Sequence, residues 1–202
     1  MPLSTDTAWP AHLLELFDDR STELDPRYRY NGPYNTLLMY GIGNGDFGFP
    51  FLVAPSAPPA CDIDDYNYML SFVVEDYRRP PVLIDGIHHG SSVLIVSMDE
   101  SWVDRADSRL KADHHMRRLY DSIVECPLPR LYGLSLLGTS LRIYVRDTST
   151  GEIKPTNGPI TGGLPHNFLE GAWDIDILSQ KGFDLMKEIV GEIVVPLEME
   201  RV

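Results

Sequence analysis

The stretch SSVLIVSMDESWVDRADSRLKADHHMRRLYDSIVEC, residues 91–126, contains the two elements that decide the fold. Its apolar run at 93–96 is continuous, which predicts a strand at 92–98 that is buried on both faces of a sheet. Apolar side chains then recur near one helical stripe along 104–126, which predicts a long amphipathic helix that ends before Pro127. A buried strand followed by such a helix indicates a sheet packed against helices.

Two further strand candidates, 68–75 and 82–87, precede the buried strand, and short turns separate all three. The simplest arrangement of three such strands is an antiparallel meander. After the long helix, strands are expected at 131–137 and 141–147, joined at Gly138. The sheet is therefore expected to contain a three-strand meander and a strand pair.

Three more helices are expected from the helical spacing of apolar residues and from capping signals. They fall around 13–17, from Pro33 to Gly41, and at 179–195. The Gly- and Pro-rich stretches at 41–59 and 148–165 predict loops. Because this length suits one core, residues 1–202 are expected to form a single α+β domain with a mixed central sheet flanked by helices.

The chain is acidic, with a formal net charge of -13. Such a charge repels nucleic acid and anionic membranes at long range unless one face concentrates positive charge. The helix from Arg105 to Arg118 concentrates it, so nucleic acid is expected to bind there or not at all, and a protein partner is the alternative. An ordinary solvated helix face accounts for the same residues. No membrane partner is expected.

The expected location is the cytoplasm or the nucleus. No apolar run approaches the roughly 18 residues needed to cross a bilayer, and the first residues lack the layout of a signal peptide. The two cysteines, Cys61 and Cys126, are too few for a disulfide framework and are expected to be packed thiols.

Three local strings resemble an uncharacterised family of fungal (basidiomycete) proteins. They are AWPAHLLELF at 8–17, CPLPRLYGLSLLGTS at 126–140 and NFLEGAWDIDILS at 167–179. The order of elements further resembles the core of the restriction-endonuclease-like, or PD-(D/E)xK, nucleases. In that superfamily an Asp on one central strand and a Glu-x-Lys on the next gather Mg²⁺ beside the scissile phosphate, and the helix that follows braces the site.

The resemblance implies that Asp85 is the metal-binding carboxylate and that Ser97-Met98-Asp99 stands where Glu-x-Lys is expected. Ser97 cannot supply the anionic ligand that Mg²⁺ prefers, and Asp99 cannot act as the cation that stabilises developing phosphate charge. The favoured hypothesis is therefore a binding or interaction module on a scaffold that has lost catalysis.

Two alternatives include chemistry. The first is a divergent Mg²⁺- or Mn²⁺-dependent nuclease, with Asp85, Asp99 and Glu100 as metal ligands, Lys111 as a migrated cation and His115 as an assisting group.

The second alternative is a His/carboxylate metalloenzyme that binds zinc, iron or manganese. The pairs His88-His89 and His114-His115 would supply its ligands, together with Asp85 or Asp99. Because adjacent side chains diverge on a strand or a helix, each pair offers one ligand at most.

Overall fold

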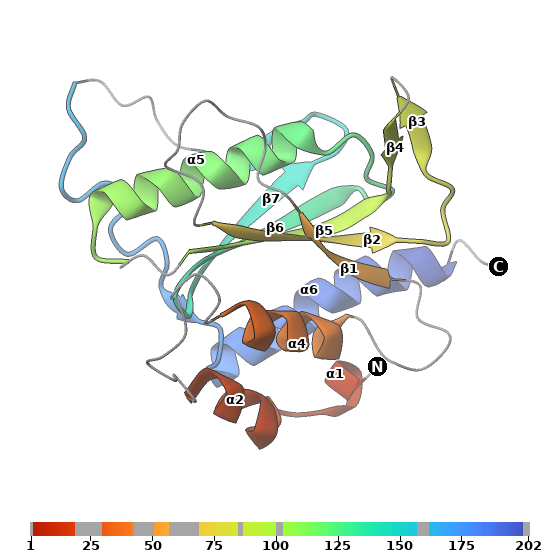
Figure 1. Ribbon diagram of the computed structural model, residues 1–202, viewed down its shortest axis with the longest axis horizontal. Coiled ribbons are helices and arrows are strands. Elements are labelled where there is room, and N and C mark those ends of the chain that lie inside the picture. Colours follow the sequence, from red (N-terminus) through yellow and green to blue (C-terminus); the bar gives the residue numbers. More distant parts are fainter. Residues whose placement is uncertain are drawn as a thin grey trace.

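The computed structural model describes residues 2–18, 30–42, 51–56, 69–84, 87–99, 103–156 and 162–199. A mixed β-sheet lies between two helical layers, with α5 on one face and α1, α2, α4 and α6 on the other (Figure 1). The helices are α1 (Pro2–Thr5), α2 (Ala11–Asp18), α4 (Asn31–Gly41), α5 (Ala106–Ser122) and α6 (Gln180–Met199). The strands are β1 (Phe51–Ser56), β2 (Leu70–Asp76), β3 (Val82–Ile84), β4 (Ile87–His89), β5 (Ser92–Asp99), β6 (Arg130–Leu137), β7 (Ser140–Asp147), β8 (Ile153–Lys154) and β9 (Ile175–Asp176).

The central sheet has the strand order β1-β2-β5-β6-β7-β8, and β9 also pairs with β7. Neighbouring strands are antiparallel, except that β5 and β6 are parallel. Parallel neighbours need a crossover connection, and α5 provides it between β5 and β6. The expectation of an α+β fold with a mixed sheet flanked by helices is confirmed.

The prediction that β5 is buried on both faces is also confirmed, because β5 is buried from Ser92 to Met98. Leu94 belongs to the core cluster that α4 and α6 share. Ile95, on the other face, packs with Met116 and Tyr120 of α5. The strand therefore contacts both helical layers and lies at the centre of the molecule.

The meander predicted with 82–87 at its centre is wrong. β3 and β4 pair with each other as a separate two-stranded sheet, whereas β2 pairs directly with β5. Val82 and Leu83 are 38% and 60% exposed, so this segment has no apolar face to bury in the central sheet. β2 buries Phe72 through Val74 and takes the position beside β5.

β1 lies in the stretch 41–59, for which a loop is predicted, and it completes an antiparallel meander with β2 and β5. Phe51 and Val53 are buried while Leu52 is 52% exposed, which is the alternation of a half-buried strand. Pro55 is tolerated because β1 is the edge strand of the described sheet.

The long helix α5 ends at Ser122, four residues before its predicted end. The next residue, Ile123, has an extended backbone with ψ at 119°. The segment that follows binds the start of β5, where the Ser92 amide donates to the Glu125 carbonyl at 3.0 Å. This hydrogen bond holds the segment after the helix beside the start of β5.

The last helix, α6, begins after Ser179, whose Oγ accepts a hydrogen bond from the Gly182 amide at 3.1 Å as an N-terminal cap. It continues through Pro196, beyond the predicted end at 195, and buries Leu197 against the core. No described helix, α6 included, is long and apolar enough to span a membrane.

Candidate functional site

Four buried polar residues form a row across the central sheet. Ser71 pairs with Ser97, Ser97 with Ser135, and Ser135 with Arg142. Directly opposed residues of neighbouring strands project from the same face, so all four lie on the face that α5 covers. Each is at most 5% exposed. We call these four residues the polar row.

His115 of α5 contacts one end of the polar row. Its Nε2 is 2.9 Å from Ser71 Oγ, and the residue is 1% exposed. Burial lowers the pKa of His115 to about 4, and the positive charge of Arg118 contributes to the same direction. The imidazole is therefore neutral at pH 7, with one of its nitrogens committed to Ser71.

Asp113 of α5 is a buried carboxylate beside the other end of the polar row. Arg142 Nη1 lies 3.5 Å from Asp113 Oδ1 and Arg117 Nε lies 3.0 Å from Oδ2. Tyr144 Oη donates to Oδ1 at 2.7 Å, and burial raises the pKa of Tyr144, so this hydroxyl stays protonated. Because a buried carboxylate is stable only when paired, these contacts fix α5 to β7.

Aromatic rings enclose the guanidinium of Arg142. Its centre lies 4.8 Å from the ring centroid of Tyr144 and 5.1 Å from that of Trp173. Trp173 Nε1 in turn donates to Ser135 Oγ at 3.3 Å. Protein groups therefore contact the polar row at Ser71, Ser135 and Arg142, which is the pattern of a structural network.

The structure brings three predicted site residues to one region. Asp99 is the half-buried last residue of β5, two positions after Ser97 and therefore on the same face. Lys111 lies one helical turn before His115 on α5. Because α5 runs back along β5 toward the start of β6, Asp99 and Lys111 both lie toward the carboxyl end of β5.

The other predicted ligands do not join them. Asp85 and Glu100 lie outside the described residues. The His88 backbone pairs with Leu83 in the separate hairpin, and His89 precedes the start of β5.

His89 and Asp99 thus lie at opposite ends of β5. A strand rises about 3.3 Å per residue, so roughly 20 Å or more separates their backbones and they cannot share one metal ion. Within the described ranges, no group of three or more His, Cys, Asp or Glu side chains is placed to hold a metal.

Much of the positive charge on α5 is used inside the protein. Arg109 is 3% exposed and donates to the carbonyls of Phe168 at 2.6 Å, Val103 at 2.7 Å and His166 at 3.1 Å. Arg117 contacts Asp113, as described above. Arg105, the exposed residue before α5, pairs with Asp107. The helix therefore presents less positive charge to nucleic acid than its sequence indicates.

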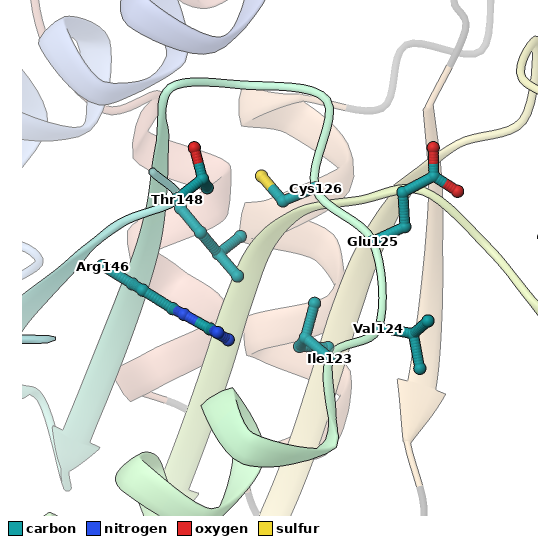
Figure 2. A pocket seen from close by; sticks show the side chains of 7 residues that line it. Ile123, Val124, Glu125, Cys126, Arg146 and Thr148 are labelled. Atoms are coloured by element: carbon teal, nitrogen blue, oxygen red, sulfur yellow. The ribbon is translucent and has the colours of Figure 1, made fainter. Parts of the chain in front are cut away.

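A pocket of about 230 Å³ lies at the carboxyl end of α5. Its lining residues are Ile123, Val124, Glu125, Cys126, Leu131, Arg146 and Thr148. The Cys126 sulfur and the Arg146 guanidinium point into the hollow from opposite walls, whereas the Glu125 carboxylate points away from it (Figure 2). We call this hollow the Arg146 pocket.

Hydrogen bonds hold the walls of the Arg146 pocket. Arg146 Nη1 donates to the Tyr120 carbonyl at 2.9 Å, at the end of α5. Thr148 Oγ1 donates to the Leu128 carbonyl at 2.8 Å, and Cys126 Sγ lies 3.7 Å from the same oxygen. Burial raises the pKa of Cys126, so the thiol is protonated at neutral pH.

A second hollow, of about 610 Å³, separates β6 from α6. Apolar and aromatic residues form part of it, including Leu128, Tyr132 and Val195. At its edge Glu192 accepts a hydrogen bond from Tyr132 and pairs with Arg130 at 3.3 Å. This contact links α6 to the start of β6.

The sequence hypotheses included neither Ser71 nor Arg146. Ser71 contributes through its pairing partner and through a helix 44 residues away, and no local pattern marks such a contact. A signal for Arg146 was present in strand β7, where simple alternation puts Arg142, Tyr144 and Arg146 on one face. Charged residues on the face of a buried tyrosine indicate a network or a ligand site.

No protein-family model, curated protein or solved structure matches this chain.

Proposed function

We propose that this chain is a non-catalytic binding module on a scaffold related to the PD-(D/E)xK nucleases. The single observation that carries the proposal is the pairing of Ser71 with Ser97 on adjacent central strands, directly beneath α5. In the superfamily an Asp and the Glu of Glu-x-Lys stand on such adjacent strands. Two neutral hydroxyls offer no anionic oxygen to a hard divalent cation.

The arrangement of elements supports the scaffold. β1, β2 and β5 form an antiparallel meander, α5 follows, and β6 lies parallel to β5. If Ser97-Met98-Asp99 corresponds to Glu-x-Lys, the partner strand is β2 and the position of the metal-binding Asp is Ser71 rather than Asp85. The helix that would brace a nuclease site here supplies His115.

The chemistry of His115 supports the loss of catalysis. A general base must reach the proton that it abstracts, and His115 is 1% exposed and committed to Ser71. Its low pKa keeps His115 neutral. It therefore does not replace the positive charge of the motif lysine, whose position Asp99 occupies. His115 therefore has a structural role in the interior, and binding is assigned to the surface of the protein.

Metal titration and cleavage assays on the wild-type protein test the proposal. We expect no saturable Mg²⁺ or Mn²⁺ binding by calorimetry and no metal-dependent cleavage of single- or double-stranded DNA or RNA. Stoichiometric Mg²⁺ binding with cleavage would replace the proposal by the divergent nuclease. Stoichiometric zinc or iron in the purified protein would replace it by the His/carboxylate metalloenzyme.

Restoring the motif tests the scaffold separately. In the triple variant Ser71→Asp, Ser97→Glu, Asp99→Lys, we expect Mg²⁺ to raise the melting temperature, because a ligand that binds the folded state stabilises it. The control variant carries Ser92→Glu at the opposite end of β5 in place of Ser97→Glu. A folded triple variant that Mg²⁺ leaves unchanged would rule out the proposed correspondence, and a triple variant that does not fold leaves the wild-type assays to decide.

A further inference from the structure

The Arg146 pocket presents a fixed cation. A guanidinium carries five N–H donors, and the bond from Nη1 to the Tyr120 carbonyl at 2.9 Å uses one of them. That bond holds the group at the end of α5 and so reduces the entropy cost of binding an acceptor. The guanidinium points into a hollow of about 230 Å³ (Figure 2).

Apart from Glu125, the remaining walls of the pocket are formed by neutral side chains. Ile123, Val124 and Leu131 contribute apolar surface, and the Cys126 thiol is protonated because burial raises its pKa. The one carboxylate in the lining, Glu125, points away from the hollow (Figure 2). An anion in the pocket therefore meets a guanidinium and apolar side chains, without a carboxylate directed at it.

We infer that the Arg146 pocket binds a small monocarboxylate. Arg146 donates charge-assisted hydrogen bonds to the carboxylate, and a short aliphatic chain packs against Ile123 and Leu131. A volume of about 230 Å³ is below the roughly 300–1,000 Å³ of sites for drug-sized ligands, so the ligand is smaller. The net charge of -13 disfavours a dianion such as phosphate more than a monoanion.

This inference goes beyond the proposed function and does not depend on the nuclease-like ancestry. Ser71 and Ser97 lie further along the sheet, toward the carboxyl end of β5, whereas the pocket adjoins the start of β6. Failure of the metal and cleavage tests would leave the pocket untouched. Failure of the pocket test would leave the proposed loss of catalysis untouched.

Alkylation of Cys126 measures the effect of Arg146. Iodoacetate is a small monocarboxylate; the thiol loses its proton to the buffer, and the thiolate displaces iodide from iodoacetate to form a thioether. Iodoacetamide is its neutral counterpart. Reaction at pH 8.5 is followed by peptide mass spectrometry at Cys126. In the wild type we expect a ratio of iodoacetate to iodoacetamide rates about tenfold above that of Arg146→Met, because Arg146 donates charge-assisted hydrogen bonds to the carboxylate of iodoacetate alone.

Two controls separate the pocket from general charge effects. Arg130→Met removes an exposed arginine from a different hollow and should leave the ratio unchanged. In the wild type, butyrate should slow the iodoacetamide reaction at Cys126 more than butyramide or inorganic phosphate does. If Arg146→Met does not fold, the butyrate comparison still decides.

Equal ratios in the wild type and a folded Arg146→Met protein, or equal protection by butyrate and butyramide, would overturn the inference. Stronger protection by phosphate than by butyrate would also overturn it, in favour of a phosphate site.

Discussion

His115 is a buried imidazole that its surroundings keep neutral. The folded protein lowers its pKa from 6.5 to about 4, first through burial and then through Arg118. Between pH 6.5 and about 4, His115 is therefore protonated in the unfolded chain but stays neutral in the folded protein. The contribution of His115 to the free energy of unfolding is therefore fully present above pH 6.5 and is lost as the pH falls toward 4.

We predict that His115→Gln weakens the dependence of stability on pH. Between pH 7 and pH 4.5 the wild type should lose roughly 2–3 kcal/mol of unfolding free energy that the variant keeps, since each pKa unit corresponds to about 1.4 kcal/mol. Urea unfolding at both pH values measures the loss. Glutamine retains a partner for Ser71, so the comparison isolates the proton.

His114→Gln is the matched control, because His114 is the exposed neighbour on the same helix. It should leave the pH dependence at the wild-type level. If the His115 variant lost as much free energy on acidification as the wild type, the buried imidazole would not be the group that titrates.

At the scale of single residues, the sequence identified His115 but not its role. The sequence offered His115 as an assisting group of a nuclease or as a possible metal ligand, whereas in the structure it is a buried, neutral partner of Ser71. Burial and the identity of a distant partner determine such a role. Neither is a property of the residues on either side in the chain.

At the scale of elements, α5 packs closely on β6 because Gly133 has no side chain. A Cβ at this position would lie 2.6 Å from Tyr120 Oη and 2.8 Å from Met116 Sδ. Tyr120 is held in place by its own hydrogen bond to the Leu131 carbonyl at 3.0 Å. The crossover helix and the strand that follows it are therefore fitted to each other at this glycine.

We predict that Gly133→Ala destabilises the protein by about 1–3 kcal/mol, because an added methyl group overpacks the contact between α5 and β6. Gly191→Ala is the counterpart in α6. A Cβ there meets nothing within 4 Å, and replacing a helical glycine with alanine should stabilise by about 0.5–1 kcal/mol. Urea midpoints of the two variants should move in opposite directions, and a neutral Gly133→Ala would contradict the close packing.

The elements that the sequence predicted well are those with local signals. These are the buried run of β5, the apolar stripe of α5 and the turn at Gly138 between β6 and β7. The residues that produce each of these signals lie close together in the sequence. Strand pairing is a different property. β2 joins β5 across an intervening hairpin, and which of the two segments enters the sheet depends on the apolar face that each can bury there.

At the scale of the whole molecule, the sheet separates two apolar layers. Trp9 lies in the layer with α6, where its Nε1 donates to the Ile177 carbonyl at 2.8 Å and its ring meets Phe183 edge-on. Trp173 lies in the layer with α5, packed with Ala112 and Leu137. The two tryptophans therefore report on opposite faces of one sheet.

β5 contacts both layers, so we predict that they unfold together as a single domain. Two single-tryptophan variants test this. One retains Trp9 and the other Trp173, and phenylalanine replaces the remaining tryptophans, Trp102 included. Within each variant, urea transitions followed by fluorescence and by far-UV circular dichroism should coincide. A fluorescence transition that precedes the loss of secondary structure in one variant would show that its layer opens independently, and residues 1–202 would then comprise more than one cooperative unit.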